Sequence, residues 1–94
     1  MTKQIYVSQP DHTAKVELNN GIKRHITRKL RSTDYRLIQA DPVIGSEGRL
    51  MNRALVELLI KSDLVLFTQD WKNSARCRLE RQICDGCGIE YIDI

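Results

Sequence analysis

The segment from Trp71 to Glu80, which reads WKNSARCRLE, gathers side chains that could do chemistry. It follows the apolar run Leu64–Phe67, whose composition predicts a short buried strand, and it opens an amphipathic stretch that predicts a helix. In open α/β sheets, ligands bind outside the carboxyl ends of the strands, where loops and helix N-termini gather. We therefore expect a ligand site at this strand-to-helix turn.

Glu80 falls on the apolar side of the predicted helix. That side also carries Cys77, Leu79, Ile83 and Cys84, whereas Arg78, Arg81, Gln82 and Asp85 fall on the opposite side. A carboxylate in apolar surroundings needs a partner, because burying an unpaired charge costs several kcal/mol. Arg76 stands four residues earlier, the spacing of an ion pair within a helix. Two interpretations follow: a structural ion pair at the edge of the core, or a carboxylate that lines a ligand cavity.

Spaced residues near both ends of the chain form a wider pattern. The run Ser62–Phe67 is followed by Trp71, Ser74 and Glu80, Gly88-Ile89 closes the segment, and the chain opens with Ile5–Ser8 followed by Pro10. The pattern resembles the short nucleoside 2-deoxyribosyltransferase-like domains common in phages and bacteria. The likeness covers residues 1–10 and about 50–94.

The resemblance implies cleavage of a nucleoside's N-glycosidic bond and transfer of the deoxyribosyl group. Glu80 matches the nucleophile, and Asp63 and Asp70 would be supporting carboxylates. Such chemistry is covalent glycosyl catalysis, in which a carboxylate attacks the anomeric carbon while the base leaves. The substrate-binding residues would be Tyr6, Ser8, Trp71, Ser74 and Arg76. The implied partner is a nucleoside or nucleotide, and neither a cofactor nor a metal is expected.

Three positions depart from the family pattern. The aspartate eight residues before Asp63 is replaced by Leu55, the glycine before the helix by Arg76, and the first-loop glycine by Gln9. The alternative function is therefore a non-catalytic interaction or regulatory protein, such as a phage-type accessory protein, on the same scaffold. Arg76 discriminates between the two. Paired with Glu80 inside the crevice it favours binding, and pointing to solvent it leaves the pocket free.

Length and composition bound the remaining possibilities. With 94 residues and 41% hydrophobic content the chain forms one domain, residues 1–94, and burial at this size is incomplete, which favours a homo-oligomer. The net charge of +3 is a modest basic excess. No apolar stretch is long enough to span a bilayer, and the N-terminus lacks a signal-peptide core, so no membrane contact and a cytoplasmic location are expected.

One predicted helix has a basic face. Arg24, Arg28 and Arg31 line up on it, flanked by Lys23 and Lys29. Such a face could grip phosphates, but no aromatic residues are interleaved and no nucleic-acid motif is present. We expect a solvated surface here rather than a nucleic-acid site.

The three cysteines, Cys77, Cys84 and Cys87, all lie near the C-terminus. Cys84 and Cys87 have the spacing of a redox or metal pair. Zinc needs four ligands, which the chain does not supply nearby, and a redox pair would open a helix rather than close one. Buried free thiols are expected, with metal or redox roles as the alternative.

Strands and helices alternate along the sequence. The expected strands are Gln4–Ser8, Tyr35–Ala40, Leu64–Phe67 and Ile89–Ile94, and the expected helices run from Asp11 or Thr13 to about Leu30, from Leu50 to about Lys61, and from the Trp71 segment to Gly86. Residues 41–48 are expected to form a loop. This alternation predicts an α/β fold, a small Rossmann-like or flavodoxin-like three-layer sandwich with three helices and a four-stranded parallel sheet in the order 2-1-3-4.

Overall fold

A parallel sheet forms the centre of the fold. The computed structural model describes residues 2–10, 15–39 and 48–94, and within these only the backbone of residues 48–52 and 54. The strands are β1 (Lys3–Ser8), β2 (Tyr35–Ile38), β3 (Leu64–Phe67) and β4 (Tyr91–Asp93). They pair in parallel in the order β2-β1-β3-β4. The predicted α/β class and strand order are confirmed.

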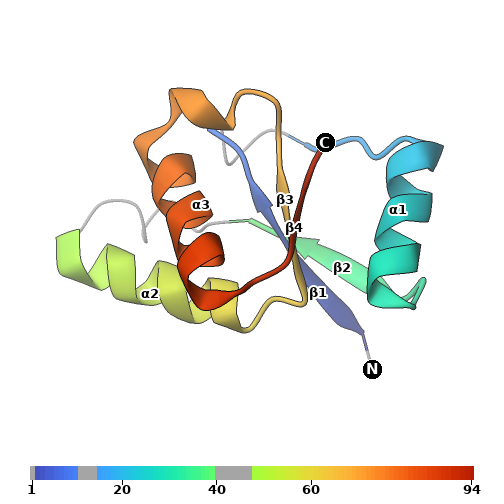
Figure 1. Ribbon diagram of the computed structural model, residues 1–94, viewed down its shortest axis with the longest axis horizontal. Helices are drawn as coiled ribbons and strands as arrows, with labels where there is room; N and C mark the ends of the chain where they lie inside the picture. The colour runs from blue at the N-terminus through green and yellow to red at the C-terminus, as the bar shows by residue number, and fades with distance from the viewer. Residues whose placement is uncertain (1, 11–14, 40–47) are drawn as a thin grey trace.

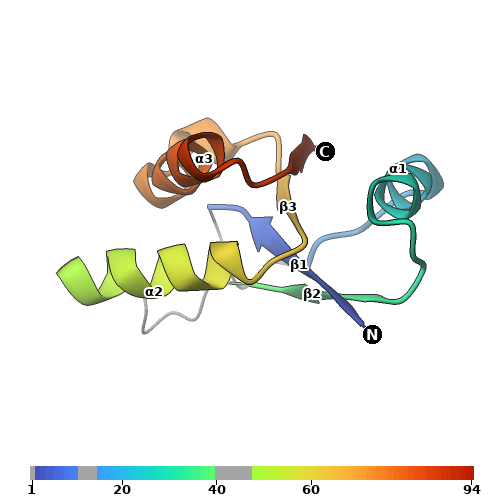
Figure 2. The same ribbon diagram turned by 60° about the horizontal axis from the view of Figure 1, so that its bottom comes forward.

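Helices cover both faces of the sheet. α1 (Asn20–Leu30) lies on one face, and α2 (Gly48–Ile60) and α3 (Ala75–Cys87) lie together on the other (Figures 1 and 2). The chain crosses the sheet in one direction from β1 to β2 and in the other from β2 to β3 and β4. Because each crossover is right-handed, the change of direction puts α1 on one face and α2 and α3 on the other. The result is the predicted three-layer arrangement.

Each sheet face has its own apolar cluster. The α1 side is built on Ile5, Val7, Ile26, Leu64, Leu66 and Ile92, and the α2–α3 side on Tyr6, Leu55, Leu59, Val65, Phe67 and Cys84. Successive strand residues point to opposite faces, so β1 and β3, buried on both sides, read as continuous apolar runs. Along β1 the alternation places Tyr6, and with it Ser8, on the side that α3 covers.

α1 begins later than the sequence predicted. Its N-cap is Asn19, whose side-chain oxygen accepts the Ile22 N–H at 2.8 Å, and residues 15–19 have no regular structure. The expectation of a helix starting at Asp11 or Thr13 is therefore wrong, although residues 11–14 themselves lie outside the described part of the chain. Val16 and Leu18 pack against the core from this irregular segment. Leu18 lies four residues before Ile22, which is the spacing of a helical repeat.

α3 also begins later than predicted. A single 3-10 turn, η2 (Trp71–Asn73), separates it from β3, and Ser74 is its N-cap. The helix continues past Gly86 to Cys87 and ends at Gly88, which has a φ of 68°. That left-handed conformation is the one glycine adopts without steric cost.

The remaining differences concern the ends of elements. β2 stops at Ile38 and β4 begins at Tyr91, each shorter than expected, whereas β3 matches its prediction residue for residue. The expected loop over 41–48 lies outside the described residues except for Gly48, which begins α2. Within the described ranges, every helix is too short or too polar to cross a bilayer.

Candidate functional site

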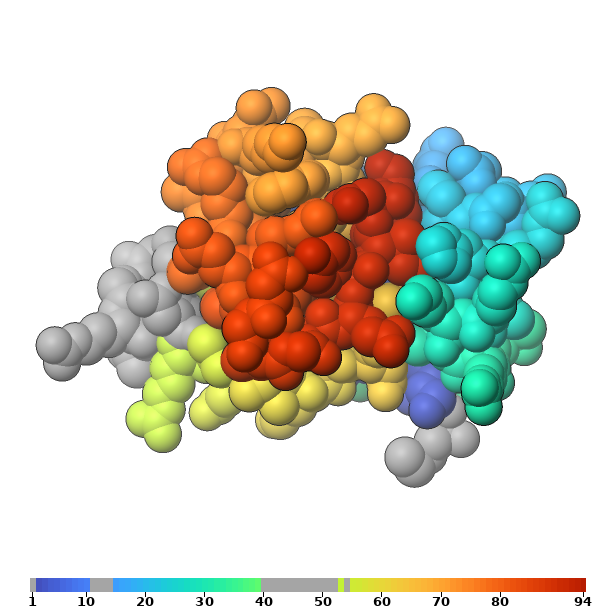
Figure 3. Space-filling view, viewed as in Figure 1, coloured from blue at the N-terminus to red at the C-terminus, as the bar shows by residue number. Residues whose placement is uncertain are grey.

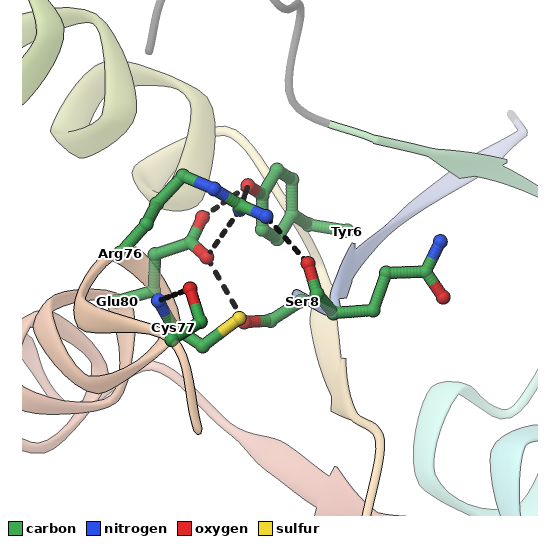
Figure 4. A network of polar contacts seen from close by, with 7 residues as sticks. Tyr6, Ser8, Arg76, Cys77 and Glu80 are labelled. Carbon is green, nitrogen blue, oxygen red and sulfur yellow. Dashed lines mark hydrogen bonds and ion pairs between the residues drawn. The ribbon is translucent and has the colours of Figure 1, made fainter. Parts of the chain in front are cut away.

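Tyr6 and Ser8 of β1 meet Glu80 of α3 at the carboxyl end of the sheet (Figure 4). The Tyr6 hydroxyl donates a short hydrogen bond to Oε2 of Glu80, and the Ser8 hydroxyl donates to Oε1 at 2.9 Å. Both β1 residues point the same way because they are two positions apart on one strand. The structure thus brings together three of the predicted site residues.

Arg76 completes this group, which we call the Glu80 cluster: Tyr6, Ser8, Arg76 and Glu80. Its Nη1 lies 2.8 Å from Oε1 of Glu80 and 3.2 Å from the Tyr6 hydroxyl, and its Nη2 donates to the backbone carbonyl of Gln9 at 2.5 Å. The predicted ion pair is confirmed. The Glu80 side chain is 0% exposed and that of Arg76 is 15% exposed, so the guanidinium is the outermost member of the pair.

The start of α3 sets the spacing of this cluster. Ser74 has extended backbone angles, and its hydroxyl accepts the Cys77 N–H at 3.3 Å, as an N-cap residue does. Arg76 therefore lies in the first helical turn and Glu80 in the next, on the same helix face. Ser74, predicted to bind substrate, is placed as the helix cap.

Burial and hydrogen bonding act against each other on Glu80. Desolvation by burial raises the pKa of its carboxyl above the ordinary value of 4.5, while the Tyr6 hydroxyl, the Arg76 guanidinium and the Ser8 hydroxyl pull that pKa down. Burial, reinforced by the neighbouring Glu80 carboxylate, also raises the pKa of Tyr6. Tyr6 is therefore a neutral donor at physiological pH.

The Glu80 carboxylate is fully enclosed. Oε2 accepts from Tyr6, and Oε1 accepts from both Ser8 and Arg76. A nucleophile must approach the reacting carbon to about 3–3.5 Å. A sugar can reach this carboxylate only after Arg76 or Tyr6 moves aside.

A hollow of about 440 Å³ opens at the same end of the sheet. Its lining is Gln9, Lys15, Val16, Glu17, Ile22, Thr68, Gln69, Asp70 and Ile94. Gln9 links this hollow to the Glu80 cluster, because it lines the hollow and its backbone carbonyl accepts a hydrogen bond from Arg76. Asp70, a predicted supporting carboxylate, lies here with its Oδ1 accepting from the Thr68 hydroxyl at 2.6 Å. Lys15, Thr68 and Gln69 were not among the predicted site residues, although a ligand site was expected at the turn that follows β3.

Asp63 is not brought to this end of the sheet. It precedes β3, and its carboxylate accepts the Gln4 N–H at 2.8 Å beside the start of β1. The length of β3, at 3.3 Å per residue, puts it about 13 Å from the carboxyl edge. Its contacts fix the register between the two strands at the amino end.

Trp71 packs against the α2–α3 core and meets Phe67 edge to face, with ring centroids 5.8 Å apart. The Arg81 guanidinium lies over three aromatic rings, 4.6 Å from the Trp71 centroid, 4.9 Å from Phe67 and 4.1 Å from Tyr91. It also pairs with both oxygens of Asp93, at 2.5 and 3.2 Å. Arg81, expected on the solvent side of α3, thus ties the helix to β4. Trp71, predicted to bind substrate, covers part of the core in this position.

The cysteines are free thiols. Cys77 and Cys84 are buried and Cys87 is exposed. Burial, together with the negative charges of Glu80 and Asp85, raises the pKa of the Cys84 thiol to about 12. Among the described residues, no three His, Cys, Asp or Glu side chains gather as they would around a metal ion.

No protein-family model, curated protein or solved structure matches the chain.

Proposed function

We propose that this chain binds a nucleoside or nucleotide at the carboxyl edge of the sheet without cleaving it. One observation carries the proposal: Glu80 is fully buried beneath three donors, with Arg76 between it and the loop that follows β1. Arg76 paired inside the crevice is the arrangement that favours binding over turnover. In this proposal Glu80 holds Arg76 and Tyr6 in place and forms no bond to the ligand.

The size and lining of the hollow beside the Glu80 cluster support a nucleoside or nucleotide as the ligand. Its volume, about 440 Å³, lies within the 300–1,000 Å³ typical of small-molecule sites. Lys15 supplies a cation for a phosphate, and Thr68 with Asp70 supplies a hydroxyl and a carboxylate for sugar hydroxyls. The site lies beside β1 and β3, between which the strand order reverses, where doubly wound sheets bind nucleotides.

A second candidate is N-glycosidic bond cleavage, with Glu80 as nucleophile. The donors from Tyr6 and Ser8 favour it, because they hold the carboxylate in one orientation and stabilise its ionised form. This reaction requires Arg76 to swing away from Glu80. It also lacks the aspartate that would assist the leaving base, since Leu55 occupies that position in the apolar core.

The third candidate is a non-catalytic interaction protein on the same scaffold. In this candidate no small molecule binds in the hollow. Substitutions in the hollow therefore separate it from the proposed function.

The test is a thermal-shift panel of nucleosides, nucleoside monophosphates and dinucleotides. A ligand at 100 times its Kd stabilises the folded state by about 2.7 kcal/mol, which raises Tm of a domain this size by roughly 11–22 °C. The shift should be lost in Asp70→Asn and Lys15→Gln and kept in Arg53→Gln, a substitution of an exposed cation on α2. A panel that shifts nothing contradicts the proposal and favours the interaction protein.

Chromatography of the bound ligands then separates binding from turnover. Intact nucleosides after long incubation are the expected result. Free base released by the wild type and abolished in Glu80→Gln would replace the proposal with the glycosyl-transfer candidate.

A further inference from the structure

Positive charge is concentrated in one segment of the chain. Residues 19–33 hold five cations and no carboxylate, whereas the rest of the chain holds ten cations and twelve carboxylates. The segment therefore carries +5 and the remainder −2. Such asymmetry within a small domain is typical of proteins that contact a polyanion.

The cations lie on the outer side of α1. Lys23, Arg24, Arg28, Lys29 and Arg31 are all exposed. The apolar side of the helix, which is Ile22, Ile26 and Leu30, packs on the sheet. Figure 3 shows the α1 side chains, coloured cyan to teal, at one end of the molecule, away from α2. The fold thus turns this charge outward.

Two shallow hollows lie on the outer side of α1. A shallow hollow of about 660 Å³ is lined by Asn20, Lys23, Arg24, Thr27 and Arg28, and a second of about 330 Å³ by Gly21, Arg24, His25 and Arg28. Arg24 and Arg28 border both. Residues four apart on a helix are about 6 Å apart along its axis, so Arg24 and Arg28 lie on the same side of α1.

These cations are not held in ion pairs within the described structure. The salt bridges there join Arg53 to Glu57, Arg76 to Glu80 and Arg81 to Asp93, all outside α1. Among the described residues, the Arg24 side chain makes one long contact, 3.4 Å from its Nε to the carbonyl of Asn20. Their charge is available to an external anion.

The sequence alone favoured a solvated surface here, but from this placement of the cations we propose that the outer face of α1 binds the phosphate backbone of double-stranded DNA. A run of exposed cations complements a regular array of phosphates, and releasing the counterions that condense on the duplex drives such binding. The face carries no base-reading pattern beyond Asn20 and Thr27, so binding should be independent of sequence.

Other polyanions fit this face less well. Single-stranded nucleic acid is held largely by stacking on aromatic side chains, and α1 has none. Duplex RNA is recognised by its shape and its 2′-hydroxyl groups as well as by its phosphates, so exposed cations alone match only part of its surface. A helix that lies on a membrane inserts large apolar residues, and those of α1 are already packed on the sheet.

The experiment is fluorescence anisotropy with a labelled 20-base-pair duplex of random sequence, at several salt concentrations. With four phosphates neutralised, the plot of log K against log salt should have a slope of about −4, which is roughly a hundredfold loss of affinity between 50 and 200 mM salt. Arg24→Gln/Arg28→Gln should reduce the magnitude of the slope by about 2. A matched single strand, duplex RNA and anionic vesicles serve as competing probes.

The control has the same change of net charge on the opposite side of the molecule. Arg53→Gln/Lys61→Gln removes two exposed cations from α2 and its C-terminal end, where the Arg53 side chain is 83% exposed. It should leave the slope and the affinity nearly unchanged. The proposal is overturned if duplex DNA does not bind, if both double variants weaken binding equally, or if any competing probe binds more tightly than duplex DNA.

Discussion

Arg76 and Glu80, one turn apart on α3, form an ion pair in which the carboxylate is completely enclosed and the guanidinium reaches the edge of the crevice. The desolvation cost of such a pair is recovered only when further hydrogen bonds satisfy the remaining polar atoms. Here Tyr6 and Ser8 supply them to the carboxylate, and the Gln9 carbonyl accepts from the guanidinium. The pair therefore fixes the position of a largely buried cation at the carboxyl edge of the sheet.

Glu80→Ala should destabilise the protein strongly. It leaves Arg76 without a counter-charge and the hydroxyls of Tyr6 and Ser8 without their acceptor, and breaking a buried pair on one side costs about 3–5 kcal/mol. Glu80→Gln keeps an acceptor oxygen and should cost less. Urea unfolding followed by circular dichroism measures both.

The control for that loss is Glu57→Ala. Glu57 pairs with Arg53 at 3.8 Å on the exposed surface of α2, where an ion pair contributes little. The free energy of unfolding of the Glu57→Ala variant should stay within about 0.5 kcal/mol of the wild-type value. Equal losses for Glu57→Ala and Glu80→Ala would show that the buried cluster adds no special stability.

The stability contribution of Glu80 should fall as pH rises. Because burial raises its pKa in the folded state above 4.5, folding binds a proton, so the contribution is complete below about pH 4.5 and is lost as pH rises through the folded-state pKa. The difference in unfolding free energy between wild type and Glu80→Gln should therefore decrease from pH 4.5 upward. A difference that increases over that range would mean that Arg76 outweighs burial.

Replacing Arg76 should extend to higher pH the range over which the stability contribution of Glu80 is lost. Arg76 lowers the pKa of Glu80, so Arg76→Gln should raise that pKa further. The difference in unfolding free energy between Arg76→Gln and Arg76→Gln/Glu80→Gln should then keep decreasing up to a higher pH than the corresponding difference between the wild type and Glu80→Gln. An unchanged window would indicate that the ion pair has no electrostatic effect on the carboxyl.

The layout of the fold could be predicted because apolar runs of strand length alternate with helical repeats. Leu64–Phe67 is a strand as predicted, and right-handed crossovers leave few orders for four parallel strands. The start of α1 could not be predicted from periodicity alone. Leu18 lies four residues before Ile22, as in a helix, but Asn19 caps the helix after it.

The Glu80 cluster could be predicted in part because two simple periods produce it. The two-residue period of β1 aligns Tyr6 with Ser8, and the four-residue spacing of α3 aligns Arg76 with Glu80. Gln9 contributes through its backbone carbonyl, which no residue pattern reveals. Asp63 precedes its strand rather than following it, and this places it at the amino end of the sheet.

Arg81→Lys should destabilise the contact between α3 and β4. A lysine cannot reproduce the two bonds to Asp93, nor spread its charge over the Trp71 and Tyr91 rings as the delocalised guanidinium does. We expect a loss of about 1–2 kcal/mol in unfolding free energy and a change in Trp71 fluorescence.

Lys72→Ala is the matched control for Arg81. The Lys72 ammonium lies 5.7 Å from the centroid of the same Trp71 ring but on the exposed surface. Its removal should change stability by less than about 0.5 kcal/mol. If the two substitutions have equal effects, the stacked guanidinium has no role in joining helix to strand.

Only one of the three thiols should react in the folded protein. Cys87 is exposed, whereas Cys77 and Cys84 are buried and the pKa of Cys84 is raised to about 12, so Cys84 holds almost no thiolate at pH 8. Titration with a thiol-reactive disulfide should label one group rapidly, and Cys87→Ser should abolish that phase. The other two should react only in denaturing urea. Rapid loss of two thiols, with the mass change of an internal disulfide, would instead establish Cys84 and Cys87 as a redox pair.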